Sequence, residues 1–169
     1  MNPSTRRLAA ATAAAALAAC VDPVPQALPA PAPAIAPPRA APAAPQEEMA
    51  AEVARLVNEH RARQGCAPLA WDAAAVRAAQ AHSDDMARRG YFNHVSPEGG
   101  NVGSRVTAAG ASWRAVAENI ASGQPTAEAV VRSWLSSSGH RANIENCVYT
   151  RQGVGYRDRV WTHVFYTPL

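Results

Sequence analysis

Residues 152–167, "QGVGYRDRVWTHVFYT", decide the fold class of this chain. In the second half of the stretch, every second side chain is aromatic: Trp161, His163 and Phe165. A period of two is typical of a β-strand. The first half is also strand-like, and the two runs meet at Asp158-Arg159. The sequence therefore predicts that the chain closes with a pair of strands.

Helical patterns precede these strands. Apolar residues recur at helical spacing in "EEMAAEVARLVNEHRARQG", and a second helix is expected from the N-cap Asp72 to Arg89, where Gly90 stops it. Shorter helices are expected over 102–109 and 126–137. Helices first and strands last favour an α+β layer architecture.

The N-terminal region carries the features of an export signal. Arg6 and Arg7 precede an alanine- and leucine-rich segment that is too short and too weakly apolar for a comfortable transmembrane span. "LAAC", ending at Cys20, resembles a bacterial lipoprotein box, which implies residues 1–19 as signal peptide and lipid on the Cys20 sulfur. The alternative is an ordinary export signal in which Cys20 has no role.

A proline-rich linker is expected to follow. Nine of residues 21–45 are proline, so this stretch cannot form a regular helix and should run as an extended spacer. We therefore divide the chain into the signal 1–19, the lipidated cysteine and linker 20–45, and one folded domain, 46–169.

Charge excludes one class of partner. The formal net charge is +3, of which Arg6 and Arg7 contribute two within the signal. The remaining chain is nearly neutral and offers no electrostatic footprint for nucleic acid.

Two polar features interrupt the apolar pattern of the domain. His94 lies on a turn-rich loop, "GYFNHVSPEGGN", and Glu118 lies within the apolar stretch "AVAENIASG". Burying an unpaired carboxylate is expensive, so Glu118 should pair with a cation, a histidine or a metal. His60 and His82 lie beside the apolar stripes of the first two helices, where packing roles are the better interpretation.

Five blocks in order carry a resemblance to a known family. They are "AAQAHSDDMARRGYFNHVSPEG", "AENIASG", "VVRSWLSSSGHRANI", "GVGY" and "WTHVF". Their order and spacing are similar to those of the CAP superfamily (cysteine-rich secretory, antigen 5 and pathogenesis-related proteins), above all its bacterial SCP-like branch. The resemblance covers nearly all of residues 49–166. It implies an α-β-α sandwich in which helices flank a small, mainly antiparallel sheet.

The resemblance also implies a cleft lined by two histidines and two glutamates, with a divalent metal in some members. By motif, His94 and His140 match the histidines and Glu118 matches the first glutamate. Two imidazoles and a carboxylate suit zinc with an open position for water. The non-metal interpretation of the same three residues is a polar, hydrogen-bonded cluster.

The fourth corner of the implied cleft is incomplete. The second glutamate of the family falls where this chain reads "WLSS", so Ser137 or a neighbour replaces it. Glu98 is a candidate substitute, although a solvated turn residue is the simpler interpretation. His163 stands where this branch usually has glutamine, and it either faces the cleft or packs. Serines 136–138 show neither the geometry nor the oxyanion hole of a nucleophile site.

Two cysteines remain after Cys20, and an even pair in an exported domain favours a Cys66–Cys147 disulfide. This bond would tie the His140 segment to the first helix.

Two functional classes follow. The favoured one is an exported, membrane-anchored binding protein whose cleft takes a metal ion, a small or lipid-like molecule, or a protein. The alternative is a metal-dependent hydrolase acting on peptides or the cell wall, which the missing second glutamate weakens because no general base is then assigned. Periplasm and cell surface are both compatible with the signal.

Overall fold

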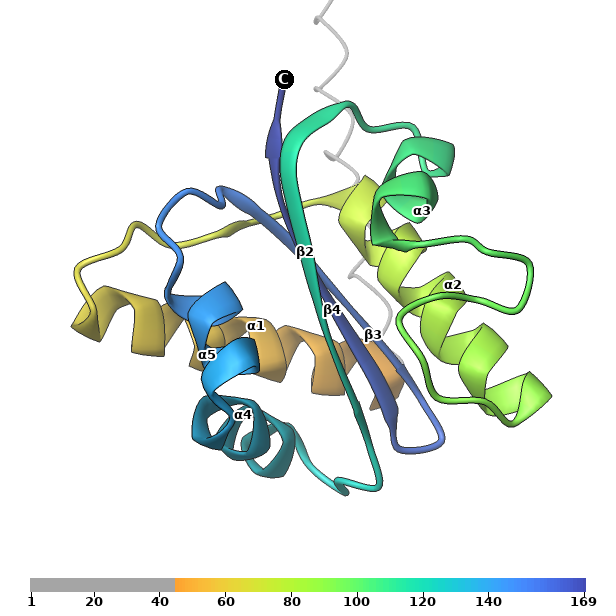
Figure 1. Cartoon of the computed structure of the whole chain (residues 1–169). Helices are drawn as coiled ribbons and strands as arrows, with labels where there is room; N and C mark the ends of the chain where they lie inside the picture. The colour runs from red at the N-terminus through yellow and green to blue at the C-terminus, as the bar shows by residue number, and fades with distance from the viewer. Residues whose placement is uncertain (1–44) are drawn as a thin grey trace, which may run out of the picture. The chain divides into compact units, whose positions relative to one another are not determined.

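A four-stranded sheet lies at the centre of the described part of the chain, residues 45–169, in this computed structural model (Figure 1). Its strand order is β1-β3-β4-β2, where β1 pairs parallel with β3 and the other pairs are antiparallel. The strands are β1 (Ala70–Trp71), β2 (Trp113–Ser122), β3 (Arg151–Arg157) and β4 (Val160–Pro168). The signal, Cys20 and most of the linker lie outside the described residues.

Helices cover both faces of this sheet, so the fold is the α+β sandwich that the sequence predicts (Figure 1). One layer contains α2 (Ala73–Arg89) and α3 (Val102–Ala108), and the other contains α1 (Pro45–Arg63), α4 (Ala127–Ser136) and α5 (Ser138–Glu145). Within residues 45–169, no helix is both long enough and apolar enough to cross a membrane.

The predicted helices and C-terminal strands are confirmed. The Asp72 carboxylate caps α2 by accepting from the backbone N–H groups of Ala74 and Ala75, and Gly90 ends the helix with φ at 68°. The β3–β4 turn consists of Asp158 and Arg159, both with positive φ, as a two-residue type I′ hairpin requires. Strand β2 and helix α5 were not among the expected elements.

The two sides of the sheet have separate apolar cores. The alternation of β4 sends Trp161 and Phe165 toward α1 and α4, and sends Val164 and Tyr166 toward α2 and α3. Both faces of β4 are buried, so the alternate residues of this strand pack into two different cores, one on each side of the sheet.

Two glycines of β3 allow α2 to pack directly on the strand. A Cβ at Gly153 would lie within 3.0 Å of backbone atoms of Ala75 and Val76, and one at Gly155 within 3.0 Å of backbone atoms of Ala79 and Gln80. Real side chains do not come this close to a backbone. The spacing between α2 and the sheet therefore depends on these two positions.

The Cys66–Cys147 disulfide is present and joins the end of α1 to the segment after α5, with the two Cα atoms 5.1 Å apart. The bond closes a loop of 81 residues, for which the chain-entropy model gives a stabilisation of about 4.5 kcal/mol. The disulfide holds the C-terminal end of α5 against α1.

Arg61 holds the same junction from inside. Its side chain is fully buried and donates hydrogen bonds to the backbone carbonyls of Ala67, Ile144, Asn146 and Tyr149, at 2.8–3.2 Å. These carbonyls lie around the C-terminal end of α5, where the helix dipole favours a positive charge. The disulfide and this arginine together fix the helix that carries His140.

Candidate functional site

Glu118 is the centre of a charged network at the free edge of the sheet. Strand β2 directs this side chain toward the α2–α3 layer, where it is only 2% exposed. One carboxylate oxygen accepts from His94 Nδ1 at 2.9 Å, and the other accepts from Arg105 Nη2 at 2.7 Å. Glu118 therefore has both a histidine and a cation as partners, as the cost of burying it requires.

Arg105 also holds the loop that carries His94. Its guanidinium donates to the backbone carbonyl of His94 at 3.0 Å and to that of Gly100 at 2.9 Å. The same side chain thus holds the carboxylate, the backbone of the histidine itself and the end of the loop that follows it. No motif marked Arg105 among the sequence's many arginines, and only its place in the fold identifies its role.

His82 of α2 contacts this loop from inside the protein and has more than a packing role. It is 1% exposed, its Nε2 bonds to the Asn93 carbonyl at 3.0 Å, and the same atom lies 3.9 Å from Glu118. Since a carbonyl only accepts, Nε2 carries the proton. Burial lowers the pKa of His82, and the nearby Glu118 charge opposes this shift. His82, which lies beside the apolar stripe of α2, is thus close to the segment that carries His94.

His140 enters the site from the other helical layer, on the first turn of α5. Its backbone carbonyl accepts from Asn119 Nδ2 at 3.0 Å, and Asn143 Nδ2 donates to Asn119 Oδ1 at 2.9 Å. Asn119 follows Glu118 in β2, so adjacent residues of one strand hold the two histidine segments. Burial lowers the pKa of the half-buried His140, and its proximity to the His94 imidazole lowers it further.

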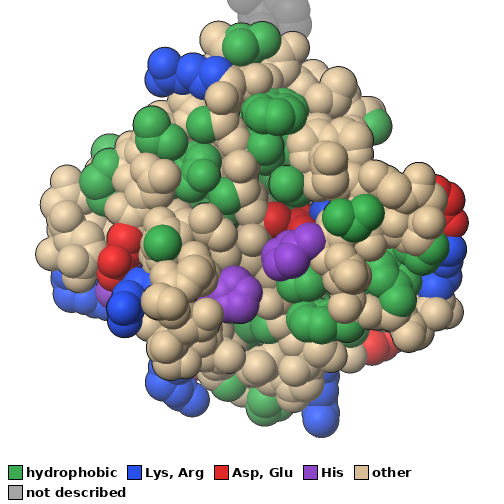
Figure 2. Space-filling view, in the orientation of Figure 1, with side chains coloured by type: hydrophobic (Ala, Val, Ile, Leu, Met, Phe, Trp, Pro, Cys, Tyr) green, Lys and Arg blue, Asp and Glu red, His purple; other side chains and the backbone are tan. Residues whose placement is uncertain are grey.

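The two imidazoles are therefore positioned from opposite faces of the sheet. Figure 2 shows two histidine side chains close together near the centre of one face, beside acidic and basic atoms set deeper in the surface. His94 is 52% exposed, whereas Glu118 beneath it is buried. The exposed surface thus presents imidazoles, and the carboxylate lies behind them.

As possible metal ligands, the imidazoles of His94 and His140 are more available than the Glu118 carboxylate. Among residues 45–169, no group of three or more His, Cys, Asp or Glu side chains is arranged to hold a metal ion. Both Glu118 oxygens already accept hydrogen bonds, and the one from His94 leaves the Nε2 lone pair of that ring facing outward. A carboxylate behind a histidine is the usual outer-shell partner of a metal ligand. The three-ligand zinc site stays a prediction.

Of the additional candidates, Glu98 pairs with a residue outside this cluster. Glu98 is 67% exposed and pairs with Arg89 at 2.7 Å, and this partner lowers its pKa. Ser137 is the N-cap residue of α5, and its side chain makes no capping hydrogen bond.

His163 is fully buried on the α1–α4 side of β4. It bonds to Gln152 at 3.0 Å and lies 3.9 Å from the Phe165 ring, centroid to centroid. Of the two interpretations open for His163, packing is therefore the one that the structure supports. His60, for which packing was also expected, bonds to Glu145 at 2.9 Å.

Comparison with known proteins shows where related domains occur. Residues 54–159 match the family described as "CAP: Cysteine-rich secretory protein family". The uncharacterised protein YkwD of Bacillus subtilis is 41% identical over 126 residues, which is 72% of this chain and 49% of that protein. The uncharacterised membrane protein YlbC of the same organism is 35% identical over 68% of this chain and 33% of its own length. The chain thus spans half or less of these relatives.

Solved structures agree with this match. An extracellular protein containing an SCP domain from Bacillus anthracis superposes with a TM-score of 0.70 at 32% identity, over 75% of this chain and 45% of that one. An outer surface protein from Borrelia burgdorferi gives a TM-score of 0.64 over 69% of this chain and 90% of that one. At 20% identity the second likeness shows the fold alone. Both of these proteins are extracellular or surface proteins by description.

Proposed function

Because the chain belongs to the CAP family of cysteine-rich secretory proteins, we propose that it is a binding protein whose cleft holds a divalent metal ion between His94 and His140. Zinc is the ion that best suits two imidazoles with outer-shell carboxylate support. The observation that carries the proposal is the 2.9 Å hydrogen bond between His94 Nδ1 and Glu118. It fixes the tautomer in which Nε2 is available as a ligand.

A bound ion would leave coordination positions for an oxygen atom of a second ligand. The surface beside His94 is apolar, since Phe92 is 52% and Val95 46% exposed on the same loop. Exposed apolar side chains next to a polar site suit a molecule with one polar and one apolar end. We therefore propose a small or lipid-like ligand for the cleft.

The alternative of a metal-dependent hydrolase requires a general base. Such a base must reach the reacting water or hydroxyl with an available carboxylate or imidazole. Glu118 already bonds to Arg105 and His94, Glu98 pairs with Arg89, and the remaining family position is a serine. Binding is therefore the function that this set of residues supports best, and release of product from peptide or cell-wall substrates would favour the alternative.

Zinc binding should depend on both histidines. We expect a His94→Ala, His140→Ala double variant to lose tight binding in calorimetric titrations, and each single variant to bind at least about tenfold more weakly because half of the protein ligands is gone. Glu118→Gln should weaken binding less, since it removes an outer-shell charge. Binding should decline below about pH 6, because protonated imidazole cannot ligate. The lowered pKa of His140 keeps that ring neutral somewhat below the ordinary histidine value.

The matched control is His60→Gln, which lies on α1 and can keep a hydrogen bond to Glu145. Its zinc affinity should equal that of the wild type. His82 is unsuitable as a control, because it contacts the His94 loop and approaches Glu118. Equal zinc affinity in the wild type and the double variant would contradict the metal site.

We also propose that Cys20 carries a lipid that anchors the protein outside the cytoplasm. The support is the "LAAC" sequence at the end of the apolar segment and the likeness to an extracellular SCP-domain protein from Bacillus anthracis. Mass spectrometry of the membrane fraction should find a lipid-modified peptide that begins at Cys20. A mature chain that begins at another residue would contradict this assignment.

A further inference from the structure

A groove between α1 and α2 lies at the opposite edge of the sheet from the site of His94, Glu118 and His140. It contains a pocket of about 470 Å³ that is lined by Gln46, Glu47, Ala50, Ala51, Trp71, Val76, Gln80 and Val154. The strand order puts β1, with Trp71, at one outer edge and β2, with Glu118, at the other. A ligand in this α1–α2 groove would therefore not touch His94 or His140.

Trp71 stands between two pockets. A second pocket, of about 420 Å³, shares Ala51 and Trp71 with the first and continues along α1 to Arg55 and Asn58. Helix α1 rises about 1.5 Å per residue, so the two pockets together follow α1 for roughly 18 Å. This length suits an elongated ligand better than a compact one.

The Trp71 side chain is unlike the other three tryptophans. It is 49% exposed, and among residues 45–169 its indole N–H has no hydrogen-bond acceptor. Trp113, Trp134 and Trp161 each donate this N–H to a backbone carbonyl. An exposed indole with an available donor is typical of a contact residue at an interface.

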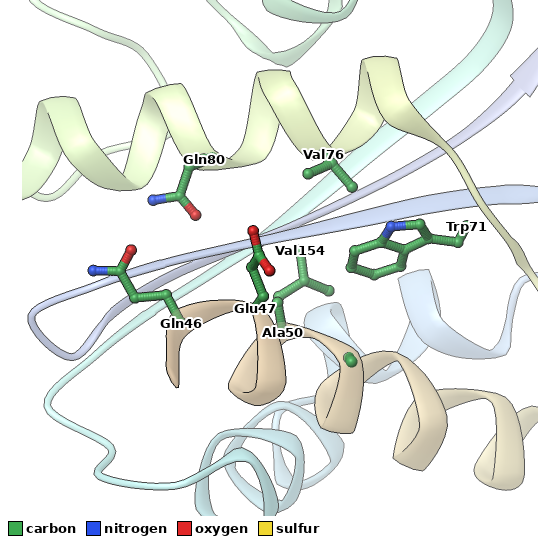
Figure 3. Close-up of a pocket in the computed structure, with 8 residues that line it drawn as sticks. Gln46, Glu47, Ala50, Trp71, Val76, Gln80 and Val154 are labelled. Atoms are coloured by element: carbon green, nitrogen blue, oxygen red, sulfur yellow. The ribbon is translucent and has the colours of Figure 1, made fainter. Parts of the chain in front are cut away.

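The available charge of the groove is negative. Glu47 forms no ion pair within the described residues, whereas Arg55, in the second pocket, is engaged by both Glu52 and Glu59. Figure 3 shows Glu47 from α1 and Gln80 from α2 pointing toward each other across the groove, with Trp71 at one end. Gln80 is already used, since its amide bonds to the backbone N–H and carbonyl of Tyr156.

Apart from Gln46 on α1, the remaining lining is apolar and small, and it includes Ala50, Val76 and Val154. We propose that the α1–α2 groove binds an extended peptide segment that presents a lysine or arginine side chain. The apolar floor suits the alkyl stem of that side chain, while the Trp71 ring face and the Glu47 carboxylate suit its charge. A glycan would need many hydrogen-bonding groups, and the groove offers only Gln46, Glu47 and the Trp71 indole N–H besides the engaged Gln80.

The test uses indole N–H signals in nuclear magnetic resonance spectra of the ¹⁵N-labelled full chain. The chain has four tryptophans, and a Trp71→Phe variant assigns the Trp71 signal by its loss. The probes are acetylated, amidated valine–alanine pentapeptides whose central residue is lysine, norleucine or glutamate. We expect the lysine peptide to shift the Trp71 signal saturably, and the glutamate peptide to leave it unchanged.

Two variants connect the result to the groove. Glu47→Gln should weaken binding of the lysine peptide by about fivefold and bring it close to the norleucine peptide, because the attraction of one exposed carboxylate is removed. Trp71→Ala should abolish binding, read from backbone signals of α1. Glu48→Gln, on the adjacent exposed position that does not line the pocket, is the matched control and should change nothing.

The outcomes also distinguish binding in this groove from binding at His94 and His140. The His94→Ala, His140→Ala double variant should bind the lysine peptide as the wild type does. No Trp71 shift with the lysine peptide, or an equal shift with the glutamate peptide, would overturn the proposal. A Trp71 shift with a chitin hexasaccharide but not with the peptides would overturn it as well, in favour of a glycan.

Discussion

Replacing Gly155 by alanine is expected to cost about 3 kcal/mol or more of the free energy of unfolding. The added Cβ would lie within 3.0 Å of the backbone of α2 at Ala79 and Gln80. A flexible side chain can relieve such a clash by changing its rotamer, but the backbone of a packed helix cannot. The whole helix must therefore move away from the sheet. Overpacking of a core commonly costs 1–3 kcal/mol, and this clash is with backbone on one side and a central strand on the other. Domains of this size have a total stability of only about 5–15 kcal/mol.

The matched control is Gly139→Ala on α5, where a Cβ meets nothing within 4 Å. Because alanine favours a helix over glycine, this variant should be equally stable or more stable by up to about 1 kcal/mol. Urea unfolding of both variants measures the difference. If Gly155→Ala unfolds at the same urea concentration as the wild type, the close contact of α2 with β3 is wrong.

Acid should destabilise the domain strongly through His163. Complete burial, aided by the positive charge of Arg61, lowers the pKa of this imidazole to about 3 in the folded state, compared with about 6.5 in the unfolded chain. The unfolded chain therefore binds the proton more tightly. The stability contributed by neutral His163 is complete above pH 6.5 and is lost progressively as the pH falls toward 3, by on the order of 5 kcal/mol in total.

The corresponding experiment compares the wild type with His163→Gln, which can still donate a hydrogen bond to Gln152. Unfolding free energies between pH 7 and pH 4 should fall less steeply in the variant than in the wild type. A smaller slope should remain, because His82 is also buried with a lowered pKa. Parallel pH profiles for the two proteins would show that His163 does not titrate on unfolding.

The regular parts of the fold were predictable because their patterns are local. Alternation in β4, the Asp72 cap and the Gly90 stop each depend on neighbouring residues in the sequence. Strand β2 was not recognised, because alanines recur through it and alanine has little preference for strands. It is an edge strand whose pairing with β4 over nine residue pairs comes from tertiary structure.

The candidate site was predictable only in part. The buried carboxylate required partners, and the structure gives Glu118 both His94 and Arg105. The role of Arg105 was not predictable, since its position opposite Glu118 depends on how α3 packs against β2. His82 was assigned to packing because its helical stripe is local, whereas its approach to Glu118 is set by the fold.

The position of the histidine site at the free edge of β2 has a thermodynamic consequence for the whole domain. One imidazole belongs to the layer of α2 and α3, and the other to the layer of α1, α4 and α5, so the proposed ion, if held by both, would act as a cross-link between the two layers. Such an ion would bind the native state alone, and at a free concentration one hundred times its dissociation constant it would add about 2.7 kcal/mol to the unfolding free energy. Because stability and ion binding are linked, any change that lets the two layers separate should also weaken the affinity for the ion. Loss of the Cys66–Cys147 disulfide or of Arg61 at the end of α5 would be such a change, and it would alter neither histidine.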